Sequence, residues 1–375
     1  MIYFDHAATT VPCRAAIDAA VRVMEEIPGN PSSVHAAGIA AAHAVQEARV
    51  SVARALGVRP DEIVFTAGGT EADNLALRGA ALALRRRGDH IVTTAVEHPA
   101  VLETLAALEK EGFSVTHVPT GEDGCVSADA VLSAVTDRTV LVSVMAVCNE
   151  TGARMPVEEI GRRLKARHSG VLFHSDMVQS FLKERIPLTH IDLASFSAHK
   201  IHGLKGCGAL YVKKGTRLVP HVTGGGQEGG LRSGTENVHS LAAFGAAAEE
   251  GARDLAARRA RIIALRKYAE ERLSAVPGLE PLRVQGVPDV FTVFLPGYKS
   301  EVLLRFLSAR DICLSAGSAC AKGKKSPVLT AMGIPADRID SALRISLGAE
   351  NTEAEIDLLC EALCAAVGSL VHTSR

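Results

Sequence analysis

From residue 60 onward, the sequence alternates short runs of β-branched and aliphatic residues with longer amphipathic stretches. The stretch 70–88, for example, spaces its apolar residues as an amphipathic helix does. Because this alternation places a helix between successive strands, it predicts an α/β fold with a mainly parallel sheet flanked by helices. The expected strands are 62–67, 90–97, 114–120, 139–147, 170–176, 193–198 and 208–214.

The composition changes after the glycine-rich run 222–237. A helical stretch rich in Ala and Arg follows at about 240–276, and beyond it apolar runs such as 289–297 precede a closing helix at 352–370. The chain has 375 residues, whereas single apolar cores stop growing at roughly 250–300 residues. We therefore expect a second, smaller α+β domain in the C-terminal part.

Charge and composition argue against several classes of protein. The formal net charge of −1 gives no support for a nucleic-acid binder. No apolar run reaches the ~20 residues that span a bilayer, and the start "MIYFDHAATT" lacks the features of a signal peptide. The eight cysteines form neither a CxxC nor a zinc-ligand spacing. We expect a soluble, cytoplasmic protein without a bound metal.

A Gly-Gly-Thr turn follows the expected strand 62–67. In an α/β sheet this turn lies at the carboxyl ends of the strands, where ligands bind. Free amides at the start of the next helix, together with the hydroxyl of Thr70, would suit a phosphate. Thr70 followed by Asp73 also resembles a capping box, and the run alone leaves both interpretations open. A nucleotide P-loop is excluded because no Gly-Lys-Ser/Thr follows.

Three polar residues, His98, Asp176 and Lys200, each follow or end an expected strand. Taken singly, they are more often a structural histidine, a capping aspartate and a surface lysine. A carboxylate at the end of a buried strand is costly without a partner such as a protonated ring nitrogen. A lysine that must lose its proton needs polar neighbours and a close backbone, as in "SFSAHKIHG". Together with the glycine turn, the three residues indicate pyridoxal phosphate, whose aldehyde condenses with a lysine amine.

Two further features suggest chemistry beyond cofactor binding. Cys320 follows Gly317 in a run of small residues and precedes Lys322 and Lys324, whose charges would favour the thiolate. Taken alone, the stretch is more simply a loop cysteine beside a solvated basic patch. Arg344 lies in an apolar, strand-like run, where its guanidinium could grip an amino-acid carboxylate. An internal salt bridge would explain Arg344 as well.

The chain resembles cysteine desulfurases of the NifS/IscS type, which belong to the class V aminotransferase group of pyridoxal-phosphate enzymes. The resemblance implies the pyridoxal-phosphate-dependent transferase fold of type I, with a seven-stranded, mainly parallel sheet. It divides the chain into a large cofactor-binding domain at 13–256 and a small α+β domain, formed by 1–12 and 257–375, that carries Cys320. The motifs that carry it are "YFDHAATT", "GNPSSVHAAG", "FTAGGTEADNLAL", "EHPAV", "CNETG", "SDMVQ", "SFSAHKIHG", "GGGQEGGLRSGTENV", "SAGSAC" and "LRISLG".

The resemblance also implies roles for residues at matching positions. Lys200 matches the Schiff-base lysine, and Cys320 matches the cysteine that forms a persulfide. His98 matches a histidine that stacks on the cofactor ring and assists proton transfer, and Asp176 matches the partner of the pyridine nitrogen. The other implied contacts are Gly69, Thr70, Ser197 and His199 at the phosphate, Asn149 and Gln179 near the pyridoxal hydroxyl, Asn30 and Arg344 at the substrate carboxylate, and Thr235 at the phosphate of the other subunit of a homodimer.

The implied reaction converts L-cysteine to L-alanine and leaves the sulfur on Cys320. The persulfide then passes to an acceptor protein for iron–sulfur cluster assembly or tRNA thiolation. A selenocysteine lyase and another class V pyridoxal-phosphate transferase stay open as alternatives, while a scaffold protein would not need the lysine, aspartate, histidine and cysteine together. Two departures are the bulky Met177 and the short, basic "AKGKKSP" after Cys320, where many relatives have a longer Ser-rich segment. The second leaves the acceptor open.

Overall fold

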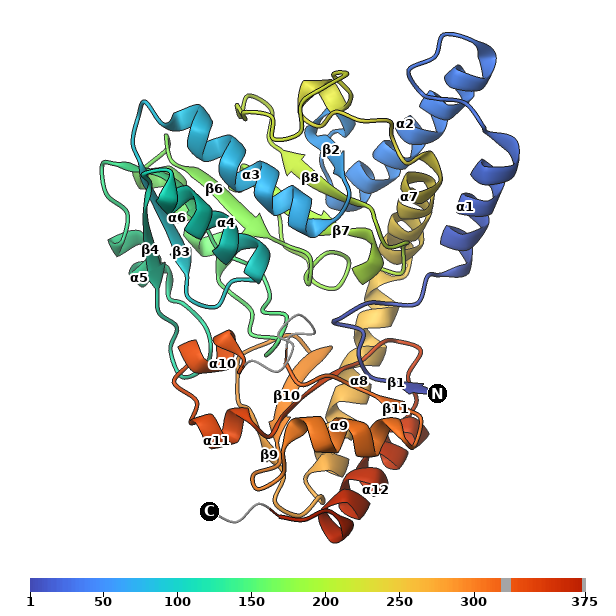
Figure 1. Cartoon of the computed structure of the whole chain (residues 1–375), viewed down its shortest axis with the longest axis vertical. Helices are drawn as coiled ribbons and strands as arrows, with labels where there is room; N and C mark the ends of the chain where they lie inside the picture. Colours follow the sequence, from blue (N-terminus) through green and yellow to red (C-terminus); the bar gives the residue numbers. More distant parts are fainter. Residues whose placement is uncertain (318–324, 373–375) are drawn as a thin grey trace.

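The computed structural model describes residues 1–317 and 325–372. Its larger sheet is mainly parallel, and the strand at 208–212 runs antiparallel to both of its neighbours (Figure 1). The predicted α/β fold with a mainly parallel, seven-stranded sheet is therefore confirmed. The strand order is β2 (Ile63–Thr66), β8 (Gly208–Val212), β7 (Leu193–Ser197), β6 (Leu172–Asp176), β5 (Thr139–Ser143), β3 (His90–Thr94) and β4 (Ser114–Val118).

Helices cover both faces of this sheet. Neighbouring strand residues alternate between two apolar clusters, so that Ile91 belongs to one cluster and Val92 to the other. Because both faces are buried, the central strands read as continuous apolar runs, which is why the sequence pattern identified them. One cluster includes α3 (Gly69–Leu84) and α4 (Pro99–Lys110), and the other includes α1 (Arg14–Glu26), α2 (Ala36–Leu56), α5 (Ala128–Ser133), α6 (Val157–Arg167) and α7 (Val238–Arg253).

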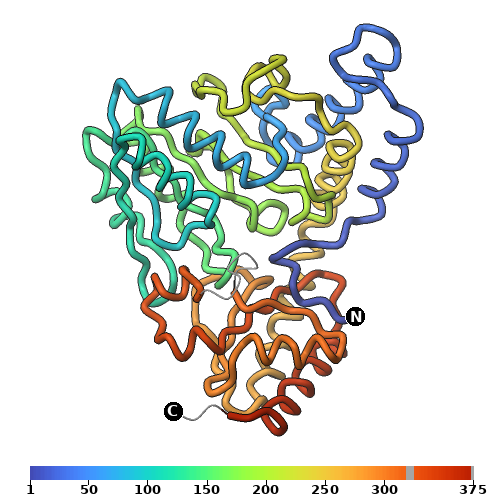
Figure 2. The backbone as a smooth tube through the Cα atoms, in the orientation of Figure 1, coloured from blue at the N-terminus to red at the C-terminus, as the bar shows by residue number. Residues whose placement is uncertain are grey.

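A separate apolar cluster forms the core of the C-terminal part. It packs on one face of a three-stranded antiparallel sheet in the order β12 (Ala342–Ser346), β10 (Val290–Phe294) and β9 (Glu280–Pro281), whose other face contributes Phe294 and Ala342 to the large cluster. The N-terminus joins this part, because β1 (Ile2–Tyr3) pairs with β11 (Ile312–Cys313) and Phe4 is buried in the cluster. Figure 2 shows the first residues, in blue, beside the orange and red C-terminal part. The division into a domain at 13–256 and a second domain stays a prediction. Such a division requires two apolar cores, and the chain has a cluster in each part.

The predicted helix at about 240–276 is two helices instead of one. α7 ends at Arg253 and α8 (Leu255–Leu273) begins after Asp254, whose ψ of 6° is not that of an α-helix. α7 packs in the large core and α8 in the C-terminal core, so the change of direction lets one stretch of chain serve both. The remaining elements are α9 (Ser300–Ser308), α10 (Pro327–Ala331), α11 (Ala336–Ile339), α12 (Glu353–Ser369), η1 (Pro60–Glu62), η2 (Ala198–Lys200) and η3 (Glu228–Gly230).

Among the described residues, no helix is both long enough and apolar enough to cross a lipid bilayer. The carboxyl ends of β3, β6 and β7 and the start of α3 meet at one edge of the large sheet, as expected for an α/β fold. The C-terminal part lies against this edge (Figure 1). The fold thereby brings polar residues from both cores to one place.

The contact between the two parts includes a close backbone approach at Gly152. Its φ is +75°, and a Cβ atom at this position would lie 2.1 Å from the carbonyl oxygen of Val290 in β10. We expect Gly152→Ala to lower the free energy of unfolding by about 2–4 kcal/mol, from backbone strain and steric overlap. Urea denaturation measures this loss.

Gly57→Ala is the matched control. Gly57 has a φ of +70°, and a Cβ atom there would meet nothing within 4 Å. This variant should lose about 1 kcal/mol from the left-handed conformation alone. Equal losses in the two variants would contradict the role assigned to the close approach.

Candidate active site

A cavity of about 250 Å³ lies at the edge where the strand ends meet the C-terminal part. Its walls come from the N-terminal segment, the start of α3, the ends of β6 and β7, the loop after β5, and β12. The structure thus brings together most of the residues that the sequence predicted. The predicted residues that line the cavity are Gly69, Thr70, His98, Asn149, Asp176, Gln179, Ser197, His199, Lys200 and Arg344.

The glycine turn at the start of α3 opens onto the cavity. Gly68 is the N-cap residue and Thr70 lies inside the helix, so the capping-box interpretation of Thr70 does not describe this helix end. Without a capping side chain, the first amides of α3 stay available to a ligand. A Cβ atom on Gly69 would lie 2.7 Å from Val178 Cγ2, which explains why glycine is needed there. The arrangement suits an anion such as a phosphate.

Lys200 ends the short helix η2 that follows β7, and its amine is buried in the cavity instead of lying at the surface. Its Nζ donates hydrogen bonds to the carbonyl oxygens of Ala7 (2.5 Å) and Ala8 (2.9 Å). Desolvation, followed by the positive charges of Lys183 and Arg344, lowers the pKa of Lys200 to about 7. At neutral pH a large fraction of this amine is therefore uncharged and nucleophilic.

Asp176 and His98 each make the local structural contact predicted for them when they are considered singly. Both residues also line the cavity. Asp176 Oδ1 accepts a hydrogen bond from the Val178 amide (2.9 Å), and His98 Nδ1 caps α4 by accepting one from the Ala100 amide (3.1 Å). Burial, and then the charge of Asp73, raises the pKa of Asp176 to about 6. Burial lowers the pKa of His98. Burial thus favours the neutral imidazole, and because Nδ1 accepts a hydrogen bond the ring proton lies on Nε2.

Asp73 is a pocket residue that the sequence interpretation treated only as part of a cap. It lies inside α3, 1 % exposed, and its Oδ1 has no hydrogen-bond partner among the described residues. His174 Nε2 is 3.5 Å away, but burial lowers the pKa of His174 to about 4, so this ring carries no charge. Burial raises the pKa of Asp73 to about 7. One sequence signal was available, since Asp73 stands among apolar residues on a buried helix.

Glu97 is a second buried carboxyl group that the sequence interpretation missed. It directly precedes His98 and accepts hydrogen bonds from the Met145 amide (2.9 Å) and the Thr94 hydroxyl (2.8 Å). These contacts tie the end of β3 to the chain after β5 and so fix the position of His98. Burial raises the pKa of Glu97 to about 8.

The side-chain ligand atoms of Asp73, His98 and Asp176 all lie within 4.8 Å of one another. Two carboxylates and an imidazole can bind a protonated ring nitrogen, and the same set could ligate a divalent cation. The lysine beside them favours the ring nitrogen, because the charged form of its amine would repel a divalent cation.

Arg344 lines the cavity from β12 and is 2 % exposed. Its Nη2 pairs with Asp5 Oδ1 (2.8 Å) and its Nη1 donates to the Asn149 carbonyl oxygen (2.9 Å). The internal salt bridge that was the alternative interpretation is therefore present. Its Nε has no partner among the described residues, so the guanidinium retains donors for another carboxylate.

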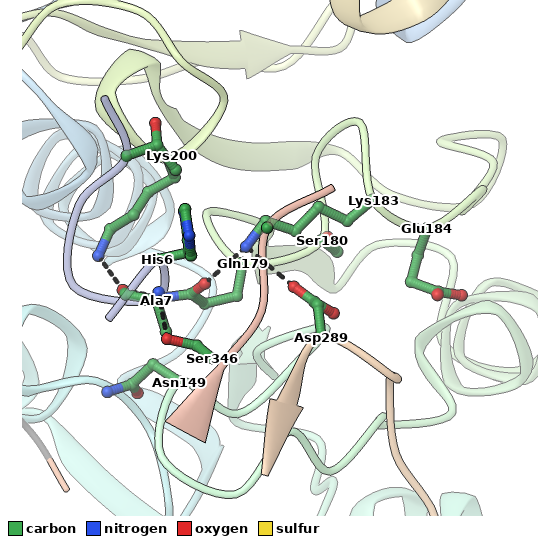
Figure 3. A network of polar contacts seen from close by, with 12 residues as sticks. His6, Ala7, Asn149, Gln179, Ser180, Lys183, Glu184, Lys200, Asp289 and Ser346 are labelled. Atoms are coloured by element: carbon green, nitrogen blue, oxygen red, sulfur yellow. Dashed lines mark hydrogen bonds and ion pairs between the residues drawn. The ribbon is translucent and has the colours of Figure 1, made fainter. Parts of the chain in front are cut away.

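Gln179 is held by two hydrogen bonds in the network of Figure 3. Its Nε2 donates to the Ala7 carbonyl oxygen (2.8 Å), and its Oε1 accepts from Lys183 Nζ (3.2 Å). His199 Nδ1 lies 3.2 Å from the Thr9 hydroxyl. The N-terminal residues Ala7, Ala8 and Thr9 thus organise the pocket, and the sequence interpretation had given them no such role.

Three predicted residues are not brought into the cavity by the described chain. Thr235 and Asn30 are exposed, and neither lines the cavity. Cys320 lies outside the described residues, together with the rest of 318–324. Met177, the bulky departure from the motif, is buried in the large apolar cluster and does not line the cavity.

Comparisons with known proteins agree with this geometry. The chain matches the family "Aminotransferase class-V" over residues 2–359. It is 39 % identical to "Cysteine desulfurase IscS" of Methanosarcina thermophila, with 100 % of this chain and 93 % of that protein covered. It is 43 % identical to "Cysteine desulfurase IscS" of Anaeromyxobacter sp. (strain Fw109-5), with 95 % and 90 % covered.

Solved structures give the same result. A structure titled "NIFS-LIKE PROTEIN" superposes with a TM-score of 0.93 at 36 % identity, covering 98 % of this chain and 100 % of that one. "SspA in complex with cysteine" superposes with a TM-score of 0.83 at 32 % identity, covering 94 % and 100 %. The resemblance inferred from the motifs is confirmed, and the chain belongs to the class V aminotransferase family, among relatives of the NifS/IscS type.

Proposed function

We propose that this protein is a pyridoxal-phosphate-dependent cysteine desulfurase, which converts L-cysteine to L-alanine and transfers the sulfur to Cys320. The observation that carries the proposal is the buried Lys200 amine, with its pKa lowered to about 7, in one cavity with Asp176, His98 and the start of α3. Relatives that carry the name cysteine desulfurase support the substrate. A structural neighbour titled as a complex with cysteine supports it as well.

The residues present fit pyridoxal phosphate. The uncapped start of α3 suits the phosphate, and Asp176 would pair with the pyridine nitrogen while His98 stacks on the ring. The unpartnered Oδ1 of Asp73 supports the presence of a further polar group in this cavity. The remaining proposed contacts are Gly69, Thr70, Ser197 and His199 at the phosphate, and Asn149 and Gln179 at the hydroxyl.

When bound, this cofactor draws electrons from the Cα atom of an amino acid. The protein's own groups would do the rest of the work. Arg344 would hold the substrate carboxylate with its free donors, and Asn30 is proposed to assist. The Lys200 amine, uncharged in large part at pH 7, would take the Cα proton, and the neutral His98 ring would carry a proton at Nε2.

The chain on both sides of Cys320 is anchored beside the cavity. Ser315 O accepts a hydrogen bond from the Arg344 amide (2.7 Å), and Ser326 donates one to Glu150, the neighbour of Asn149. Cys320 itself lies outside the described residues, five positions after Ser315. We therefore propose that Cys320 accepts the substrate sulfur as a persulfide and passes it to an acceptor protein.

The remaining proposals concern the oligomeric state, the sulfur acceptor and the cellular location of the enzyme. The exposed Thr235 is proposed to reach the phosphate in the other subunit of a homodimer. The acceptor is proposed to serve iron–sulfur cluster assembly, in line with relatives named IscS, or tRNA thiolation. A cytoplasmic location stays a prediction. Selenocysteine lyase and other class V transferase activities are outcomes of the first test below.

Replacing Cys320 tests the reaction. Because the thiol would be the sulfur acceptor, Cys320→Ala should lower alanine and sulfide production from L-cysteine by at least about 100-fold, with cofactor absorbance retained. Mass spectrometry should find one added sulfur on Cys320 of the unaltered protein. The exposed Cys364 provides the control, and Cys364→Ala should keep full activity. Full activity in Cys320→Ala would favour an alternative transferase.

The rate of cofactor loading should depend on pH. Only the uncharged amine attacks an aldehyde, and burial lowers the pKa of Lys200 to about 7. The rate at which cofactor-free protein turns yellow with pyridoxal phosphate should therefore rise with pH to a plateau, with a midpoint near 7. A small lysine derivative, with a pKa of about 10.4, should show no plateau below pH 9. A midpoint near 10 in the protein would contradict the assignment of Lys200.

A further inference from the structure

Lys183 stands at the centre of the polar network in Figure 3, outside the set of residues that line the cavity. Its Nζ donates to Gln179 Oε1 (3.2 Å) and pairs with Asp289 Oδ2 (3.2 Å). Both charged side chains are largely buried, with 12 % of Lys183 and 6 % of Asp289 exposed. A buried ion pair is weak evidence of stabilisation, because desolvation offsets the attraction. The position of the Lys183–Asp289 pair therefore needs an explanation other than a gain in stability.

The backbone around Lys183 is held in an unusual conformation. Leu182, the residue before it, has a φ of +55°, which is strained for a leucine. The carbonyl oxygen of Lys183 accepts a hydrogen bond from Arg259 Nη1 (3.1 Å) on α8. Strain of this kind persists only where the surroundings enforce it, and the contact with Arg259 is one such constraint.

A continuous path connects Lys183 to the amine of Lys200. Lys183 holds one end of the Gln179 amide, and the other end donates to the Ala7 carbonyl oxygen. That same oxygen accepts the hydrogen bond from Lys200 Nζ. Lys183 and Lys200 thus contact the two ends of one hydrogen-bonded path. The positive charge of Lys183 disfavours protonation of Lys200 and so lowers its pKa.

We propose that Lys183 is a positioning residue for the proposed reaction: paired with Asp289, it orients Gln179 and places a positive charge at the far end of the hydrogen-bonded path to the Lys200 amine. Asp289 immediately precedes β10, so the pair also ties this charge to the C-terminal part. The inference rests on the proposed function only in taking Lys200 as the reacting amine.

Other charged and titratable groups face the two lysines and belong to the same balance. Arg344 opposes the protonation of Lys200, whereas Asp176 and Asp5 favour it. The groups around the two lysines are His98 and His199 at Lys200, and His6, His199, His202 and Arg258 at Lys183. None of these groups is changed in the variants below. A shift in the pH at which the Lys200 amine becomes reactive therefore reports the Lys183–Asp289 pair.

The test measures the protonation of Lys200 directly in the full chain without cofactor. Trace acetylation with acetic anhydride across pH, followed by mass spectrometry of the Lys200 peptide, gives the midpoint at which the amine becomes reactive. Removing a neighbouring positive charge should raise this midpoint by about 1 pH unit in Lys183→Met. Labelling of Lys200 at pH 7 then falls about fivefold.

Two further variants make the sign of the effect decisive. Asp289→Asn leaves the charge of Lys183 uncompensated, so the midpoint should move down, opposite to Lys183→Met. Lys183→Arg keeps the charge and should stay near the midpoint of the unaltered protein. A role in folding alone would not shift the midpoint in opposite directions.

Lys165→Met is the matched control. Lys165 forms a partly buried ion pair with Asp192 in the large core and does not line the cavity. Its loss leaves a similar carboxylate unpaired, yet the midpoint of Lys200 should not move. The proposal is overturned if Lys183→Met matches this control, or if Asp289→Asn shifts the midpoint upward.

The same variants loaded with cofactor separate this inference from the proposed function. The pH at which the rate of alanine formation is half-maximal should follow the order of the labelling midpoints. Failure of the unaltered protein to bind pyridoxal phosphate would remove the proposed function, while the labelling result would still decide the role of Lys183. Bound cofactor with unshifted midpoints would remove only that role.

Discussion

One residue, Ala7, connects the C-terminal sheet to the candidate catalytic lysine through its two backbone polar groups. Its amide donates to Ser346 Oγ on β12 (2.9 Å), and its carbonyl oxygen accepts from Lys200 Nζ and Gln179 Nε2. Buried peptide groups have to be hydrogen-bonded, so moving this segment would leave groups in both cores unpaired. The place of the amine in the cavity therefore depends on a residue 193 positions away in the sequence.

The cavity and the chain directly beside it contain groups that are costly to bury. Burial raises the pKa of the carboxyl groups Asp73, Glu97 and Asp176 to about 7, 8 and 6, and it lowers that of Lys200 to about 7. Burying such groups lowers stability unless partners or a ligand satisfy them, and proteins retain them where chemistry requires it. The C-terminal part contributes to this by placing Arg344, a fully buried cation, beside the same cavity.

Much of this site could be predicted from single residues because the fold brings strand ends together. Once the α/β pattern was recognised, residues after strands such as Asp176 and Lys200 had to meet at one edge of the sheet. Asp73, Asp5 and Lys183 could not be assigned in this way. Asp73 lies within a pattern that also describes a helix cap, and Asp5 and Lys183 acquire roles only from partners in distant parts of the chain.

The sequence by itself determined the family, the α/β fold and the residue types of the candidate site, because these follow from local patterns and ordered motifs. Only the tertiary structure decided the chemical state of those residues. Whether Lys200 is a solvated cation or an amine that is uncharged in large part depends on its burial and on the charges of Lys183 and Arg344. Which N–H groups of Arg344 remain for a ligand depends on its contacts with Asp5 and Asn149. Desolvation and charge pairing act through space, so no local pattern in the chain contains them.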